Sequence, residues 1–141
     1  MNSYTHALIL ISDKKDGIPL LSQAAELAQS LRLKITLAHI SDDYRQLNYV
    51  SDSLMDEVVS EEVAKARALL NELAGMISGR VDTLELVTMR RFADLSQCIT
   101  DLGIDLVIAG HRNRFMGALT SRSAEYINHL TVDVLIKHIP N

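Results

Sequence analysis

The chain has 141 residues, of which 48% are hydrophobic and 23% are charged, and its formal net charge is -4. These values predict one globular domain over residues 1–141 and exclude a disordered chain. The acidic balance argues against a nucleic-acid partner, which would require a concentrated basic face. The single cysteine, Cys98, excludes an intrachain disulfide and a thiolate metal site. Because residues 1–5 lack a signal-peptide pattern and no apolar run has membrane-spanning length, we expect a cytoplasmic protein with no membrane partner.

The first half of the chain alternates short apolar runs with a helical pattern. Residues 6–11 (HALILI) predict a strand buried on both faces. Residues 13–17 are typical of a polar turn, after which Pro19 suits the first position of a helix. The apolar face of this helix repeats at Leu20, Ala24, Leu27 and Leu31. Residues 34–40 (KITLAHI) predict the second strand, and the polar residues 41–52 predict a long connection.

The second half continues the alternation. Residues 81–88, 105–109 and 132–139 predict the third, fourth and fifth strands. One helical stripe precedes the third strand, a second lies between the third and fourth strands, and a last one follows the fourth strand. The stripe of the long second helix is Val59, Val63, Ala66, Leu70, Leu73 and Ile77. We expect Gly79 to end that helix and Gly103 to end the next one, because glycine is favoured just after a helix. The last two stripes are Leu95, Ile99 and Leu102, and then Leu119, Ser123, Tyr126, Ile127 and Leu130.

Strands that alternate with helices in this way predict the α/β class. We expect one doubly wound, five-stranded parallel sheet with helices on both faces and right-handed crossovers. Ligands of such sheets bind at the carboxyl ends of the strands, where the strand order reverses. The loops that reach this edge are residues 12–16, 41–43, 88–92 and 110–123. Neither Gly-x4-Gly-Lys-Ser/Thr nor Gly-x-Gly-x-x-Gly follows the first strand, which argues against a P-loop hydrolase and a dinucleotide enzyme.

The most specific stretch is residues 105–140, DLVIAGHRNRFMGALTSRSAEYINHLTVDVLIKHIP. It closely resembles the C-terminal part of universal stress proteins, which consists of a strand, a loop, a helix and a final strand. The LILIS strand at residues 8–12 and the long second helix extend the resemblance over essentially the whole chain. The resemblance implies the Rossmann-like, adenine nucleotide alpha hydrolase-like fold. It also implies a nucleotide loop after the fourth strand in those members that bind ATP.

That loop is degenerate in this sequence. In the family's nucleotide-binding members it carries Gly-x2-Gly-x9-Gly followed by Ser or Thr, whose backbone N–H groups and helix start hold phosphates. The corresponding residues here are Gly110, Asn113, Ser123 and Ala124, so two glycines and the hydroxyl are missing, and His111 and Arg112 lie between the first two. Asn113 can adopt a positive φ, but the Ser123 Cβ would crowd a phosphate.

Two further positions depart from the ATP-binding pattern. The adenine-contacting aspartate of the family falls on Ser12, with Asp13 one residue late, and a shift by one along an extended chain reverses the side chain. A glycine that usually follows the third strand is replaced in the Met89–Arg90 region. Together these changes resemble the universal stress protein A-like subfamily, and the resemblance implies that ATP is not bound and that no cofactor is required.

Each of these residues has a simpler interpretation as well. Gly110 and His111 are also typical of a turn that leaves a buried strand. Arg112 and Arg114 are more typical of two solvated surface cations than of an anion site. Cys98 is favoured as a small core residue over a redox sensor. The five histidines show no i, i+4 pair, which argues against a metal site. No catalytic triad or acid–base pair is readable from the sequence.

These observations favour a non-enzymatic stress-response protein that acts as a homodimer through contacts with unknown protein partners. The alternatives are an adenine-nucleotide-binding switch with little or slow hydrolysis, and an enzyme on a related α/β scaffold. The family resemblance places the last strand at a sheet edge, and an apolar edge requires cover. We therefore expect two copies to join through this strand. Its apolar residues are Val132, Val134, Leu135, Ile136 and Ile139.

Overall fold

The structure, a computed structural model, describes residues 4–11, 14–42, 52–77, 81–88, 90–111, 126–127 and 129–139. Seven residues of the predicted nucleotide site lie outside these ranges. They are Ser12, Asp13, Met89, Arg112, Asn113, Ser123 and Ala124.

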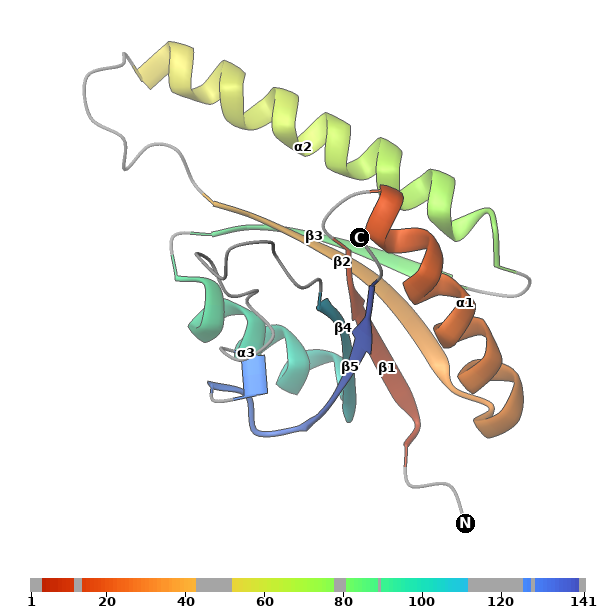
Figure 1. The fold of residues 1–141 in the computed structure, drawn as a ribbon. Helices are drawn as coiled ribbons and strands as arrows, with labels where there is room; N and C mark the ends of the chain where they lie inside the picture. Colours follow the sequence, from red (N-terminus) through yellow and green to blue (C-terminus); the bar gives the residue numbers. More distant parts are fainter. Residues whose placement is uncertain are drawn as a thin grey trace, which may run out of the picture.

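The described residues form five strands and three helices, with a helix after each of the first three strands (Figure 1). In order they are β1 (His6–Leu10), α1 (Lys14–Leu31), β2 (Lys34–Asp42), α2 (Asp52–Ala74), β3 (Val81–Thr88), α3 (Arg91–Leu102), β4 (Leu106–His111) and β5 (Asp133–His138). Every strand pair is parallel, and the order across the sheet is β3-β2-β1-β4-β5. The predicted five-stranded, doubly wound fold is therefore confirmed. A few helical residues, 126, 127 and 129, precede β5.

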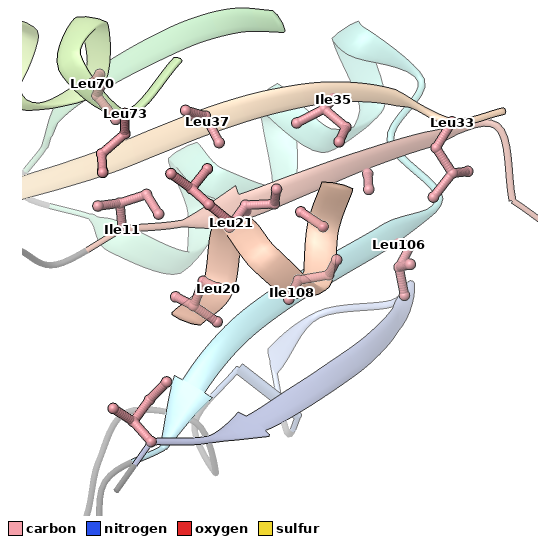
Figure 2. Packing of buried hydrophobic residues seen from close by; sticks show 14 residues of the cluster. Ile11, Leu20, Leu21, Leu33, Ile35, Leu37, Leu70, Leu73, Leu106 and Ile108 are labelled. Atoms are coloured by element: carbon pink, nitrogen blue, oxygen red, sulfur yellow. The ribbon is translucent and has the colours of Figure 1, made fainter. Parts of the chain in front are cut away.

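The sheet separates two hydrophobic layers. On the first face, covered by α1 and α2, strand residues such as Ile35, Leu37 and Ile108 belong to one cluster with Leu20 and Leu73 (Figure 2). The second face is covered by α3 and the residues around 126–130, and it takes the alternate positions of each strand. This burial on both sides explains why the central strands β1 and β4 are largely continuous apolar runs. Truncation of one such leucine to alanine costs about 2–5 kcal/mol in folding free energy.

The start of α1 differs from the prediction. The helix begins at Lys14, so the expected polar turn over residues 13–17 is mostly helical and Pro19 lies inside the helix. Contacts with α2 explain this. Gly17 is buried, and a Cβ built on it would be 2.8 Å from Leu73 Cδ1. Lys14 Nζ lies 2.6 Å from Glu72 Oε1. These contacts offset the hydrogen bond that Pro19 cannot donate.

The helix ends agree only in part with the sequence pattern. Gly103 ends α3 as predicted, with a left-handed φ of 69° and with its N–H donating to the last turn. By contrast, α2 ends at Ala74, five residues before Gly79, through a turn in which the Met76 N–H donates to the Leu73 carbonyl at 3.0 Å. Of the predicted last stripe, Tyr126 and Leu130 are buried, whereas Ile127 is 56% exposed.

Candidate functional site

The strand order reverses between β1 and β4, which lie side by side at the centre of the sheet. Their carboxyl ends are held by backbone hydrogen bonds on either side. The Ile11 N–H donates to the Ala38 carbonyl at 2.8 Å, and the Ile139 N–H donates to the His111 carbonyl at 2.7 Å. This edge is therefore the candidate ligand-binding end of the sheet.

Of the predicted loop residues, the structure describes Gly110 and His111. Both belong to the end of β4, where they are paired with Lys137 and His138 of β5. The loop residues that would complete a phosphate site after His111, and those after β1, lie outside the described residues.

Gly110 has a packing reason to be glycine. A Cβ built on it would be 3.1 Å from Ile139 Cγ1 and 3.6 Å from Leu20 Cδ1. Ordinary carbon–carbon contacts lie at about 3.5–4.0 Å. The space beside the Gly110 backbone is thus filled by hydrophobic side chains of the first face. This contact accounts for Gly110, the one glycine of the family motif that the degenerate loop retains.

A cluster of aromatic side chains ties the region after β3 to the segment before β5. The Phe92 ring stacks on His129, with centroids 4.4 Å apart and an interplanar angle of 18°. It also meets Tyr126 edge-on at 5.8 Å and 70°. Arg91 Nη1 donates a hydrogen bond to the Tyr126 hydroxyl at 3.2 Å. The sequence pattern identified Tyr126 as apolar-facing but missed the Phe92–His129 stack, because the pair is distant in sequence and follows no local period.

A polar network closes the opposite, amino end of the sheet. His6 is 6% exposed, its Nδ1 lies 3.1 Å from the Leu102 carbonyl oxygen, and its Nε2 lies 2.7 Å from Thr36 Oγ1. Since a carbonyl oxygen only accepts, Nδ1 carries the proton in the neutral ring and Nε2 accepts from the Thr36 hydroxyl. Burial lowers the pKa of His6, against the hydrogen bond to Leu102. The ring is therefore neutral near pH 7.

The Asp105 carboxylate completes this network. It accepts the backbone N–H of Thr5 at 2.8 Å and of His6 at 3.0 Å, and the Thr5 hydroxyl at 2.9 Å. Partial burial raises its pKa, but the hydrogen bonds from His6 and Thr5 together outweigh that effect, so the pKa is lowered. The network orders the start of β1 beside β4. It lies at the end of the sheet away from the candidate ligand site, which indicates a structural role.

Other candidate chemistry is weak in the part of the chain that the structure describes. Cys98 is partly exposed and lies outside both buried clusters, unlike its predicted place in the core. Burial, and then the carboxylates of Asp101 and Asp94, raise its pKa, so the unreactive thiol is favoured. Among the described residues, no three His, Cys, Asp or Glu side chains gather as metal ligands, and no helix is long and apolar enough to cross a membrane.

A groove of about 400 Å³ lies between α1 and β5. Its lining carries charged groups of both signs on a surface that is mostly apolar. The residues are Pro19, Ser22, Gln23, Glu26, Lys137 and His138. The groove is open to solvent rather than enclosed, and it reaches the carboxyl end of β5, where Lys137 and His138 pair with Gly110 and His111 of β4.

Comparisons with known proteins agree with the fold and with the sequence resemblance. The model of the universal stress protein family matches residues 3–138. A universal stress protein A homolog from Haemophilus ducreyi is 31% identical over 137 residues, which cover 94% of this chain and 95% of the relative.

Two solved structures share the fold at low sequence identity. The hypothetical protein MJ0577 superposes with a TM-score of 0.80 at 16% identity, over 98% of each chain. A universal stress protein in complex with cAMP superposes with a TM-score of 0.63 at 16% identity, over 96% of this chain and 98% of that chain. These two likenesses concern the fold alone. The family match and the relative, both nearly full-length, establish that this chain belongs to the universal stress protein family and is similar to universal stress protein A.

Proposed function

We propose that this protein is a non-enzymatic, cytoplasmic stress-response factor that acts as a homodimer through protein contacts and does not bind ATP. The single observation that carries the dimer is the exposed edge of β5. The strand lies at the end of the sheet order, and its four central residues, from Val134 to Lys137, are only half-buried. An edge of branched apolar residues favours association with another strand.

The other edge strand, β3, is protected in a way that β5 is not. Glu85 points inward beneath α2, its side chain is 8% exposed, and its Oε2 lies 3.3 Å from Arg67 Nε. Burial raises the pKa of Glu85, and Arg67 opposes that shift. An inward-pointing charge on an edge strand disfavours pairing with a second sheet. The contrast supports β5 as the strand that pairs.

The absence of ATP binding is supported by the sequence of the loop and by the packing of Gly110. Only one of the three family glycines is retained, and a Cβ built on it would lie 3.1 Å from Ile139 Cγ1, closer than an ordinary contact. Retention of Gly110 is therefore explained without a phosphate. ATP binding is also disfavoured by the departures from the family's ATP-binding pattern at Ser12, Asn113, Ser123 and Ala124.

Sedimentation equilibrium and calorimetry test the two parts of this proposal separately. We expect a dimer at tens of micromolar chain, and Leu135→Asp or Ile136→Asp should give monomers because each places a charge on the edge strand. Thr83→Asp is the matched control, since Thr83 is exposed on the other edge strand, and it should leave the dimer intact. A wild-type monomer would contradict the dimer, and micromolar heat-detected binding of Mg-ATP would contradict the loss of nucleotide.

The second candidate is an adenine-nucleotide switch of the same fold, with little or slow hydrolysis. It is favoured by the shared fold with the universal stress protein that was solved with cAMP. It predicts adenine absorbance in the purified protein and saturable binding of nucleotide in calorimetry. An enzyme on this scaffold is the third candidate, and the described side chains offer no acid–base pair at the candidate edge to support it.

A further inference from the structure

We propose that His6 is an acid-sensitive latch at the amino end of the sheet: when its neutral ring takes up a proton, the end of α3 and the start of β1 separate while the rest of the sheet stays folded. The ring joins three elements, because it belongs to β1 and bonds to both α3 and β2. The latch does not depend on the proposed homodimer or on the absence of ATP binding. It gives a conformational role to a buried histidine at the end of the sheet away from the candidate ligand site.

Both nitrogens of the His6 ring are used in its neutral form. Nδ1 donates to the carbonyl of Leu102, the last residue of α3, at 3.1 Å, and Nε2 accepts from the Thr36 hydroxyl of β2 at 2.7 Å. Both His6 and Thr36 are buried. A proton added at Nε2 would turn this acceptor into a donor, so the Thr36 hydroxyl hydrogen would have to turn away from the ring. Protonation therefore breaks the match between donor and acceptor and places a charge in a buried site.

The charged groups that surround the ring do not compensate for burial of that charge. Burial lowers the pKa of His6 most, the hydrogen bond to the Leu102 carbonyl raises it, Lys34 lowers it, and Asp105 and Asp82 raise it, with a net pKa below the ordinary value. Lys34 Nζ lies 3.4 Å from Asp82 Oδ2, so these charges of β2 and β3 partly offset each other. Asp105 keeps its charge where His6 titrates because, despite partial burial, the hydrogen bonds that it accepts lower its pKa.

The direction of the pH effect follows from these contacts. Release of the ring into water restores its ordinary pKa of about 6.5. The closed form has the lower pKa, so between the two values it binds fewer protons than the open form. The closed form is therefore most stable above about pH 6.5 and loses stability as the pH falls toward its own pKa. For one proton, the population of the open form rises by at most about tenfold for each pH unit in this window.

The segments that the ring joins have few buried apolar contacts of their own. Leu102 is 44% exposed, and Gly103, which ends α3, is exposed as well. Thr5, the residue before β1, is also exposed, and its N–H and hydroxyl donate to the Asp105 carboxylate. Segments of this kind open at the lowest free energy. Loss of the ring contacts should therefore open the amino end without unfolding the two hydrophobic layers.

Amide hydrogen exchange followed by NMR tests the latch at both ends of the same sheet. The reporters at the amino end are the N–H groups of Lys34 and Asp105, which donate to carbonyls at the start of β1 at 3.0 Å. The controls at the carboxyl end are the N–H groups of Ile11 and Ile139, which donate at 2.8 and 2.7 Å. From about pH 7.5 to about pH 5.5, corrected for intrinsic exchange, protection of the reporters should fall several-fold, with a limit of about tenfold. Protection of the controls should stay constant.

Two variants identify the responsible group. His6→Gln cannot titrate in this range, so its reporters should lose no protection between the two pH values. His138→Gln is the matched control because His138 is exposed, and its reporters should respond as in the wild type. A response that persists in His6→Gln would overturn the assignment to His6.

The wild type alone also decides the proposal if His6→Gln does not fold. Equal loss of protection at the two ends of the sheet would indicate global unfolding and overturn the latch, as would unchanged protection of the reporters. In the same samples, the NMR titration of the His6 ring should have its midpoint below about 6.5. A midpoint at or above that value would overturn the latch, because protonation would then not favour the open form.

Discussion

Gly110 at the end of β4 lies against Ile139 so closely that an added Cβ would be 3.1 Å from the Ile139 Cγ1 atom. The same glycine is the one motif glycine that the degenerate nucleotide loop retains. Its neighbours are hydrophobic side chains of the first face of the sheet. The close packing of two strand ends therefore constrains a position that the family resemblance associates with phosphate.

Substitution of Gly110 tests this packing. We expect Gly110→Ala to lower the free energy of unfolding by about 1–3 kcal/mol, because the new methyl group overpacks a filled site. Urea denaturation of the variant measures the loss. In an Ile139→Ala background the penalty of Gly110→Ala should shrink, since the contacting atoms are gone. An equal penalty in both backgrounds would show that Ile139 is not the cause.

The stability of the protein should depend on pH through His6. Burial lowers its pKa in the folded state, whereas the unfolded chain titrates near 6.5. Between these two pKa values the unfolded chain binds more protons, so the free energy of unfolding should fall as the pH drops below about 6.5. Urea midpoints at about pH 7.5 and about pH 5.5 measure the difference.

The matched control is His6→Gln, which cannot titrate in this range. Its midpoint should be lower than that of the wild type at neutral pH but should change less between the two pH values. If the wild type and His6→Gln lose stability equally on acidification, then another histidine is responsible. Thr36→Val should also destabilise the neutral protein, because it removes the hydroxyl that donates to the ring.

The aromatic cluster should couple α3 to the segment before β5. Phe92 stacks on His129 and meets Tyr126 edge-on. A double-mutant cycle with Phe92→Leu and His129→Gln should give a coupling of about 0.5–1.5 kcal/mol in unfolding free energy. The exposed residue Thr100, on the same helix, provides a control, and Thr100→Ala combined with His129→Gln should be additive. Additivity of the Phe92 and His129 pair would indicate that the stack adds no stability.

Partial restoration of the nucleotide loop should recover little binding. We expect Asn113→Gly with Ser123→Gly to improve phosphate or ATP binding only in part, because Ser12, Met89 and Ala124 remain unchanged. Calorimetric titration of the double variant with Mg-ATP, beside the wild type, measures the gain. Micromolar binding by this variant alone would show that the other positions matter less than the sequence suggests.

The sequence was sufficient for the architecture because the relevant signals are local. The runs at residues 6–11 and 34–40 and the stripe ending at Leu73 each report the burial of one element, and the alternation of elements implies a parallel sheet. The glycine at the end of α3 was likewise predicted, since its left-handed φ is a local requirement. The candidate site was foreseen in outline, and of its residues the structure describes Gly110 and His111.

Other features depend on segments that meet only in the folded chain. Pro19 looked like a helix start, but Gly17 packed on Leu73 extends α1 back to Lys14. Likewise, the Phe92–His129 stack and the filled space beside Gly110 join residues that no periodic pattern connects. The sequence by itself determined the order and kind of the elements, because helix and strand patterns are short-range. Only the tertiary structure decided where α1 begins and which side chains meet at the strand ends, because those contacts depend on the packing of distant segments.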